Sequence, residues 1–255
     1  KGVYLNNVES TVKRIRNHPS LAYYVASNES SEVTGTRELL MKLDGTRGYQ
    51  MQSECEGVHD GSPYKQVNPM QHYENTASSR GSRVDGFNPE YGAPTLPTVE
   101  ILKEMMDEKD LWPINREVWD YLDGNGFHLM STMYKELVDN YGKSSSIEEF
   151  AQKGQFVGAI NSKSIWEVWN YNKLDYGDRF CSGLLFWYHN CPVRQVSARM
   201  WDWSLEPTAS LYHTANALEP LHVQFDYLKN TVSVVNDYYQ EFEGYTVVAQ
   251  VYDIN

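Results

Sequence analysis

An alternation of helix-like and strand-like segments with short links constrains the fold of this chain most. Val8, Val12 and Ile15 recur at helical spacing, so the first segment is predicted to be a helix. It should end before Pro19, because proline disfavours the helical conformation in the residue that precedes it. The continuous apolar run at 21–26 then predicts a strand buried on both faces. Repetition of this order favours an α/β fold with a parallel sheet.

The alternation continues through most of the chain. Residues 54–85 are loop-rich, and long loops at one end of an α/β scaffold usually carry function. The strands predicted in this part of the chain are at 48–52, 70–73, about 84–88 and 183–188, the last of them buried. Helices are predicted at 36–43, near Trp119 and near Met133, and after Pro97, where Ile101, Leu102, Met105 and Met106 lie on the buried side. A further helix begins at the capping-box pattern of Ser146 and Glu149 and runs to about Asn170.

The character of the sequence changes near Glu219 and Pro220. Strand-like, β-branched runs follow at 221–225, 231–236 and 246–252, separated by turn residues. They are typical of the opening strands of an antiparallel sandwich. We therefore divide the chain into domains at 1–218 and 219–255, the second of them incomplete.

Charge and composition exclude several classes of function. The formal charge of −12, without a basic stripe, disfavours nucleic-acid binding. No apolar run is long enough to span a bilayer, and no signal peptide is visible, so no membrane contact is expected. The three cysteines are widely spaced and form neither a disulfide framework nor a metal pattern. We expect no metal and no cofactor. Because Lys1 lies within an amphipathic pattern, the chain is expected to be an excised piece.

Two predicted strands end in a carboxylate beside polar residues. Asn28-Glu29 follows the strand at 21–26, and Glu90 follows the strand at 84–88. Two carboxylates at the ends of parallel strands can meet in one cleft, which is the minimum apparatus for cutting a glycosidic bond with retention. A chain with 34 acidic residues has many such pairs, so the residues around each carboxylate must show whether the pair is catalytic.

Four segments resemble glycoside hydrolase family 2. They are Arg16-Asn17-His18-Pro19-Ser20 before the strand that ends in Asn28-Glu29; Gly86-Phe87-Asn88-Pro89-Glu90 followed by Pro94-Thr95-Leu96-Pro97-Thr98 and Met105-Met106; Gly183 to Trp187; and Glu219 to Gln224 followed by Thr231 to Asn236. The resemblance implies a partial (β/α)8 TIM barrel, about strands 4 to 8, and then the first strands of an immunoglobulin-like β-sandwich. The branch that the chain most resembles is the exo-β-D-glucosaminidases, with β-mannosidases and β-galactosidases as relatives.

The resemblance also implies catalytic roles. Glu29 is the candidate general acid/base, which donates a proton to the leaving oxygen and then activates water. Glu90 is the candidate nucleophile and must stay ionised. By spacing alone, either residue could simply cap a following helix. Asn28 is similar to the asparagine that contacts the sugar 2-position, although a turn asparagine looks the same. Exo-β-D-glucosaminidases tend to have Ser-Asp where this chain has Asn28-Glu29, which leaves a 2-hydroxyl sugar open.

Three further residues are candidates for substrate binding. Asn88 flanks Glu90 at the strand end, and Tyr73 is similar to a tyrosine that hydrogen-bonds the nucleophile in related barrels. Trp187 is expected to form the floor under the sugar ring, with core packing as the alternative. His72, beside Tyr73, is interpreted as a structural histidine.

Together these expectations describe a retaining glycoside hydrolase that removes β-linked sugars from non-reducing ends by double displacement. The substrate is an oligosaccharide or glycoside. The alternatives are a β-mannosidase, a β-galactosidase, a non-catalytic carbohydrate-binding protein and an inactive fragment. An open partial barrel exposes strand edges, so self-association is expected, and sedimentation that shows only monomer would count against it. For a bacterial parent enzyme we expect an extracytoplasmic location, periplasmic or secreted.

Overall fold

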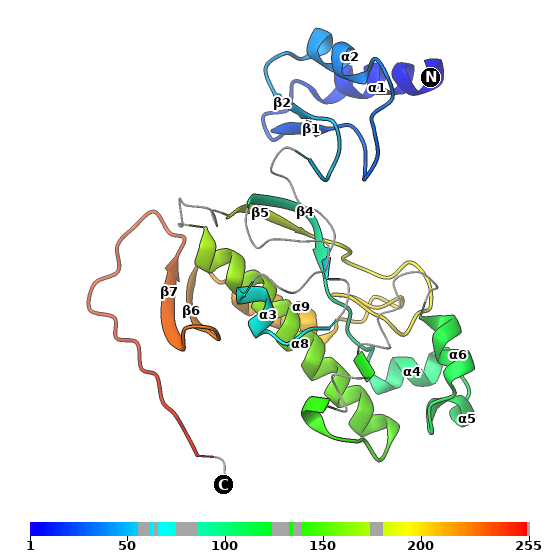
Figure 1. The fold of residues 1–255 in the computed structure, drawn as a ribbon, viewed down its shortest axis with the longest axis vertical. Coiled ribbons are helices and arrows are strands. Elements are labelled where there is room, and N and C mark those ends of the chain that lie inside the picture. Colours follow the sequence, from blue (N-terminus) through cyan, green and yellow to red (C-terminus); the bar gives the residue numbers. More distant parts are fainter. Residues whose placement is uncertain are drawn as a thin grey trace. The chain divides into compact units, whose positions relative to one another are not determined.

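In the computed structural model the chain is described at residues 1–55, 62–63, 66–74, 86–123, 133–134, 139–173 and 181–253. It forms two compact units, Lys1–Asp60 and Gly61–Asn255, whose elements are coloured along the sequence in Figure 1. The expected division between residues 218 and 219 differs from this one and stays a prediction. The helix expected near Met133 falls largely outside the described residues.

The first unit has the predicted element order. Helix α1 (Gly2–Ile15) is followed by strand β1 (Tyr23–Val25), helix α2 (Thr36–Leu43) and strand β2 (Gly48–Gln50). The two strands pair in parallel, which confirms the expected strand direction in this unit. The Tyr4 hydroxyl of α1 donates to the Ala26 carbonyl at 3.2 Å and so ties this helix to the end of β1.

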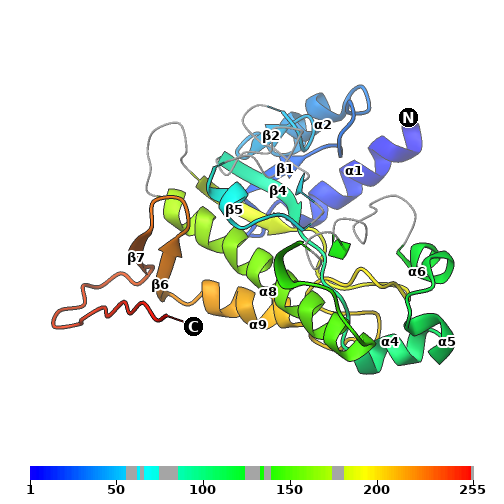
Figure 2. The same cartoon turned by 60° about the horizontal axis from the view of Figure 1, so that its bottom comes forward.

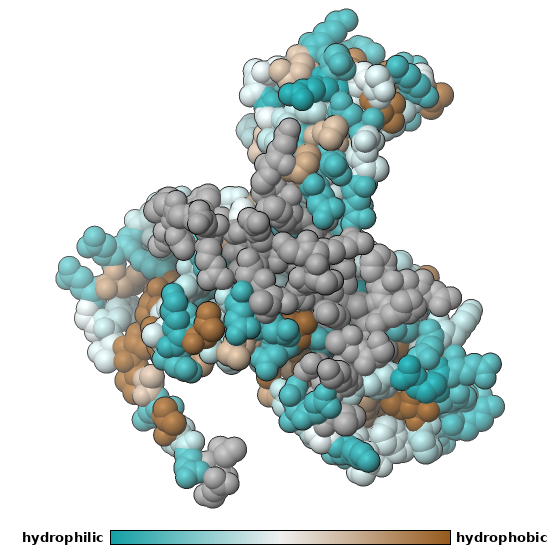
Figure 3. Space-filling model, in the orientation of Figure 1, coloured by the Kyte–Doolittle hydropathy of each residue, from teal (hydrophilic) through white to brown (hydrophobic). Residues whose placement is uncertain are grey.

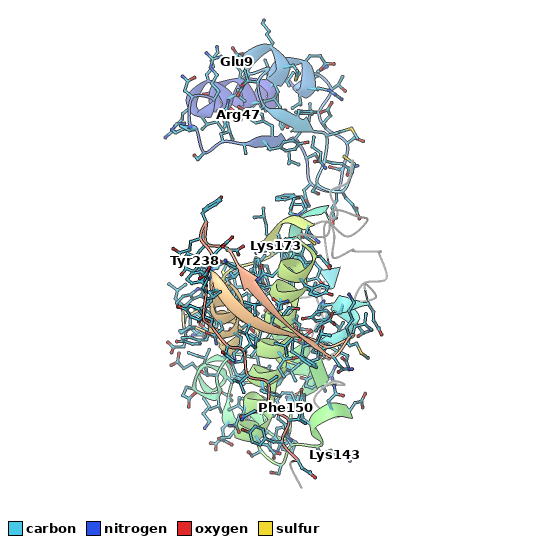
Figure 4. All side chains as sticks on the ribbon, turned by 90° about the vertical axis from the view of Figure 1, so that its left-hand side faces the viewer. Glu9, Arg47, Lys143, Phe150, Lys173 and Tyr238 are labelled. Carbon is cyan, nitrogen blue, oxygen red and sulfur yellow. The ribbon has the colours of Figure 1, made fainter. Side chains whose placement is uncertain are left out.

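An ion pair fixes the loops of the first unit. Arg47, labelled in Figure 4, binds the Asp44 carboxylate at 2.5 Å and also donates to the carbonyls of His18 and Leu21. Hydrogen bonds from Thr46, Tyr24 and Arg47 lower the pKa of Asp44 to about 2, with the Thr46 hydroxyl contributing most. The carboxylate therefore stays ionised at neutral pH and links the segments that lead into β1 and β2.

The first strand is less buried than predicted. The side chains of Tyr23 and Val25 are 47% and 46% exposed, so the expectation of burial on both faces is wrong for this structure. A strand is buried on both faces only where other elements pack on each face of its sheet. In the described part of this unit, α1 and α2 are the only helices that can cover the β1–β2 sheet, so part of β1 stays exposed.

The second unit contains a three-stranded parallel sheet in the order β3-β4-β5. Its elements are β3 (Ser62–Pro63), α3 (Met70–Tyr73), β4 (Gly86–Gly92), α4 (Val99–Met105), α5 (Glu108–Leu111), α6 (Arg116–Leu122), α8 (Ile147–Asn172), β5 (Cys181–Phe186), α9 (Ala209–Ala217), β6 (Leu221–Asp226) and β7 (Thr231–Asn236). Helix α8 packs against β5 and runs beside α9, as Figure 2 shows.

The strand predicted at 70–73 is wrong, because these residues form helix α3. Two side-chain hydrogen bonds stabilise the start of this turn: the Asn68 side chain accepts from the Met70 amide at 3.0 Å, and the Gln71 side chain accepts from the Asn68 amide at 3.1 Å. This local hydrogen bonding outweighs the β propensity of the apolar residues. The parallel neighbour of β4 on this side is β3 instead.

The cap predicted for α8 is confirmed. The Ser146 hydroxyl accepts from the Glu149 amide at 3.3 Å, while the Glu149 carboxylate accepts from the Ser145 amide at 2.8 Å. The first bond satisfies a backbone donor that the first helical turn leaves without an intrahelical partner, and the second holds the residue before the N-cap. The helix continues for 26 residues and ends at Asn172, close to the predicted end.

The main hydrophobic core lies between α8 and the helices that follow β4. Ile101, Leu102 and Met105 of α4 are buried there as predicted, together with Trp119 of α6 and Phe150 of α8. Phe150 is labelled in Figure 4 among the side chains of this region. The fourth predicted core residue of α4, Met106, is only partly buried and packs at its edge.

The C-terminal hairpin buries polar side chains and exposes apolar ones. Strands β6 and β7 pair antiparallel as predicted, but β6 turns His222, Gln224 and Asp226 inward and leaves Val223 and Phe225 about half exposed. In Figure 3 hydrophobic residues gather over this hairpin. The strand predicted at 246–252 is wrong, because these residues have no regular structure. A strand needs a paired neighbour for its backbone groups, and β propensity alone does not supply one.

Polar contacts attach the hairpin to α8. Nε2 of His222 lies 2.9 Å from the Glu167 carboxylate, and the Gln224 amide donates to the Glu167 carbonyl at 2.8 Å. All three residues are buried. Since buried polar groups must be hydrogen-bonded, these pairs fix the register of β6 on the helix.

Candidate active site

Ser53 organises the strand-end segment that carries Glu29. The Ser53 hydroxyl accepts from the Glu29 amide at 3.1 Å and donates to the Asn28 side-chain oxygen at 3.0 Å. The Ser53 amide in turn donates to the Ser27 carbonyl at 3.1 Å. This buried serine after β2 therefore holds Asn28 and Glu29 at the end of β1. Sequence reasoning missed it, because an isolated serine in a loop carries no distinguishing pattern.

The backbone of Glu29 is strained. Its φ is 47°, in the left-handed region that side-chain-bearing residues rarely adopt. Such a conformation costs on the order of 1–3 kcal/mol and persists only where the surroundings hold it, often at functional sites. Here the hydrogen bond from the Glu29 amide to the Ser53 hydroxyl stabilises this conformation. Both Asn28 and Glu29 are exposed.

Glu90 lies in a β-bulge. Between the pairs Asn88–Leu184 and Tyr91–Phe186, β4 advances three residues while β5 advances two. The extra residue falls at Pro89 or Glu90, where proline is tolerated because a bulge interrupts the ladder. Bulges redirect side chains and are common beside active sites. The strand extends to Gly92, so Glu90 stands within its C-terminal part rather than after it.

Asn88 braces the segment that carries Glu90. It is completely buried, and its side-chain oxygen accepts from the Glu90 amide at 2.9 Å. Within the described residues, its Nδ2 is buried and has no hydrogen-bond partner. The Glu90 side chain is partly buried. The side-chain oxygen of Asn88 therefore positions the Glu90 backbone.

A buried histidine–tyrosine pair supports this strand from the side. Nδ1 of His72 lies 2.7 Å from the Tyr91 hydroxyl, and the Tyr91 ring packs on Trp169 at 5.3 Å between ring centroids. Burial lowers the pKa of His72 to about 4 and raises the pKa of Tyr91. Both side chains are neutral at pH 7, as expected for a structural histidine.

The buried His72 predicts a pH dependence of stability. We expect the free energy of unfolding to fall as the pH drops from about 6.5 to about 4, because the unfolded chain binds a proton that the folded chain refuses. The full contribution is ~3 kcal/mol. Urea unfolding between pH 7 and pH 4 measures it. His72→Gln should have a shallower pH slope than wild type. Equal slopes for His72→Gln and wild type would contradict the prediction.

Trp187 follows β5 beside the end of β4. Its amide donates to the Tyr91 carbonyl at 2.9 Å. The indole is partly buried and meets the Tyr188 ring edge-on at 4.5 Å. The buried Arg199 places its guanidinium 5.9 Å from the Trp187 ring centroid and 4.8 Å from that of Tyr188. Asn88, Glu90 and Trp187 thus share one end of the β4–β5 pair.

The Tyr73 hydroxyl bonds to the C-terminal hairpin. The phenol donates to the Phe225 carbonyl of β6 at 3.1 Å, and its ring packs on Tyr227. The single phenolic proton therefore helps to attach the C-terminal hairpin. A hydrogen bond from Tyr73 to Glu90 stays a prediction, and it would require this proton to change partner.

The described ranges also bear on metal binding and on membrane spanning. They contain no group of histidine, cysteine and carboxylate side chains placed to hold a metal ion. None of their helices combines the length and apolarity needed to cross a bilayer. Cys55, Cys181 and Cys191 are thiols.

Known proteins resemble this chain over most of its length. No protein-family model matches it. It is 23% identical to the mannosylglycoprotein endo-β-mannosidase of Lilium longiflorum across 99% of this chain and 31% of that protein. It is 25% identical to the exo-β-D-glucosaminidase of Amycolatopsis orientalis across 78% of this chain and 20% of that protein. The chain therefore spans about a fifth to a third of these curated relatives.

Solved structures show the same fold. The crystal structure of the Amycolatopsis orientalis exo-chitosanase matches with a TM-score of 0.78 at 21% identity, over 92% of this chain and 29% of that one. A variant of that enzyme has also been solved in complex with PNP-β-D-glucosamine. The β-D-mannosidase from Dictyoglomus thermophilum matches with a TM-score of 0.71 at 18% identity, over 93% and 32%. The resemblance stated from the sequence is thus confirmed: this chain is similar to exo-β-D-glucosaminidases and β-mannosidases over most of its length.

Proposed function

We propose that this chain is part of a retaining β-glycosidase, with Glu90 as the nucleophile and Glu29 as the general acid/base. The observation that carries the proposal is the bulge in β4, which presents Glu90 next to the buried amide of Asn88 at the end of parallel strands. The strained, Ser53-held position of Glu29 at the end of another parallel pair adds support. The glycosidase relatives supply the reaction class.

The chemistry proceeds by double displacement. Ionised Glu90 attacks the anomeric carbon while Glu29 gives its proton to the leaving oxygen, which forms a glycosyl-enzyme ester and releases the aglycone. Glu29, now ionised, takes a proton from water, and the resulting attack on the ester releases the sugar and restores Glu90. We assign Asn28 and Asn88 to the sugar hydroxyl groups and Trp187 to the ring face.

This mechanism requires the strands of both units to belong to one barrel. We propose that β1 and β2 with β3, β4 and β5 correspond to strands 4 to 8 of a (β/α)8 barrel, and that the β6–β7 hairpin opens an immunoglobulin-like sandwich. A crystal structure of the full-length protein tests this. Carboxyl groups of Glu29 and Glu90 roughly 5–5.5 Å apart fit retention, whereas roughly 6.5–9.5 Å would indicate inversion. A still larger separation of the two carboxyl groups would contradict the assignment of Glu29 and Glu90 as the catalytic pair.

The candidate substrates are β-glucosaminides, β-mannosides and β-galactosides. The Asn28-Glu29 pair, where exo-β-D-glucosaminidases tend to have Ser-Asp, favours a sugar with a 2-hydroxyl group. The match of an endo-β-mannosidase across 99% of this chain points the same way. Assays of the full-length protein on p-nitrophenyl β-glycosides of mannose, glucosamine and galactose separate these candidates. Self-association and an extracytoplasmic location remain part of the proposal.

Replacement of Glu29 tests the acid/base role through the leaving group. In Glu29→Gln we expect kcat/KM to fall about 10²- to 10⁴-fold for glycosides with a poorly acidic aglycone, because these need protonation as they leave. Activated dinitrophenyl glycosides should lose far less. Glu38→Gln, an exposed carboxylate of α2, serves as the control and should match wild type on both. An equal loss on the two substrates would show that Glu29 is not the proton donor.

A further inference from the structure

A cavity of about 460 Å³ opens beside Trp187. Its walls come from the loop that follows β5 and from the end of α6. The lining residues are Asp123, Trp187, Tyr188, Asn190, Pro192, Gln195, Ser197 and Arg199. This volume lies within the range of roughly 300–1,000 Å³ typical of small-molecule sites. Of the described residues, neither Asn88 nor Glu90 contributes to its walls, so the cavity differs from the nucleophile site.

The cavity is built from ordered segments. The Val196 amide donates to the Leu122 carbonyl at 3.0 Å, and the Ser197 hydroxyl donates to the Asp123 carbonyl at 3.4 Å. These bonds dock the loop on the end of α6. Arg199 is anchored by bonds to the carbonyls of residues 197 and 198 at 3.2 and 3.0 Å. The walls therefore exist without a ligand, which reduces the cost of binding.

The chemistry of the walls selects a neutral polyhydroxy ligand. Asp123, Gln195, Ser197 and Arg199 are all buried. The Gln195 Nε2 donates to the Ser197 carbonyl and the Ser197 hydroxyl donates to the Asp123 carbonyl, so these two side chains have acceptor oxygens to offer a ligand, while the Arg199 guanidinium carries donors only. Among the lining residues the charges of Asp123 and Arg199 offset each other, so the walls carry no net charge that would favour an ionic ligand. The Trp187 indole adds an apolar surface for the C–H face of a ring. A sugar unit has this combination of hydroxyl groups and an apolar face.

We propose that this cavity is a second sugar subsite, which holds a neighbouring sugar of an oligosaccharide whose cleaved bond lies at Glu90. Trp187 borders both sites, so the two sugars would lie on either side of one indole. The inference rests on the proposed function for its reaction, but the binding of an oligosaccharide can be measured without turnover. The consequence is selectivity for substrate length rather than for the sugar at the cleaved bond.

Asn190 provides the test because it is exposed at the mouth of the cavity and can be replaced without disturbing the core. In the full-length protein, Asn190→Trp should fill the mouth and lower kcat/KM on a β-1,4-linked tetrasaccharide of mannose or glucosamine about tenfold, chiefly through KM. Asn190→Ala should lower it about threefold, the value of one neutral hydrogen bond. Both variants should stay within about twofold of wild type on the corresponding glycosyl fluoride, whose leaving group is too small to reach the subsite. Asn216→Trp, at an exposed asparagine of α9, is the matched control.

The outcomes separate the subsite from the proposed reaction. Equal changes on the long and the short substrate, or no change on either, would overturn the subsite. If no glycoside is hydrolysed, the proposed function fails, and calorimetric titration of the same tetrasaccharides decides the inference alone. Binding to wild type that Asn190→Trp weakens supports the subsite. No binding to wild type, or binding that Asn190→Trp leaves unchanged, overturns it.

Discussion

Glu90→Gln is expected to lower the kcat of the full-length protein on aryl β-glycosides by about 10⁴-fold or more, because the amide cannot form the covalent intermediate. Such a loss corresponds to ~5.5 kcal/mol of transition-state stabilisation. The Asn88 contact is made by the Glu90 backbone amide, so the substitution leaves it in place. We therefore expect an unfolding midpoint near that of wild type. Steady-state kinetics and urea unfolding on one preparation measure both quantities.

A second variant identifies the role of Glu90 rather than its importance. Glu90→Gly opens space in which azide can act as an external nucleophile, and the product should then be the glycosyl azide of inverted configuration. Glu100→Gln, an exposed carboxylate in the first turn of α4, is the matched control and should keep full activity. Residual activity of Glu90→Gln above about a tenth of wild type would remove Glu90 from the nucleophile position.

Gly92→Ala is expected to destabilise the second unit by ~2–4 kcal/mol and to impair catalysis as well. A Cβ on residue 92 would lie 2.2 Å from the carbonyl oxygen of Trp187, which is backbone and cannot rotate away. Either β4 or the segment at Trp187 must then move. Since Glu90 and Trp187 flank this contact, the shift should reach both the nucleophile and the sugar platform.

The matched control is Gly2→Ala, whose Cβ would meet nothing within 4 Å. It should leave stability within ~0.5 kcal/mol of wild type or raise it slightly, since alanine favours helices. Thermal and urea unfolding compare the two variants, and kinetics follow on the folded fractions. If Gly92→Ala unfolds at the wild-type midpoint, the close approach of β4 to Trp187 does not exist in solution.

Local patterns predicted the regular elements well where one physical signal dominated. The spacing of Val8, Val12 and Ile15 predicted α1, and the Ser146 cap predicted the start of α8, because helical periodicity and capping depend on neighbouring residues only. The strand predicted at 70–73 was wrong because two side-chain hydrogen bonds at the start of the turn outweighed its β propensity.

Some residues of the candidate site could be identified from the sequence and others could not. Glu29, Glu90 and Trp187 could be selected from the sequence because each ends a strand-like run and matches a family segment. The bulge that redirects Glu90, and the contacts of Ser53 and Arg199, could not be selected. A bulge is a difference in length between two paired strands, and the partner of β4 lies more than 90 residues away along the chain.

The sequence by itself determined the class of fold, the order of most elements and the pair of carboxylates, since these follow from periodicity, propensity and motif. Only the tertiary structure decided which strand neighbours β4, which face of β6 is buried and which side chains surround Trp187. These features depend on contacts between residues that are distant in the chain. The energy of such contacts comes from burial and hydrogen bonding that no local window of sequence contains.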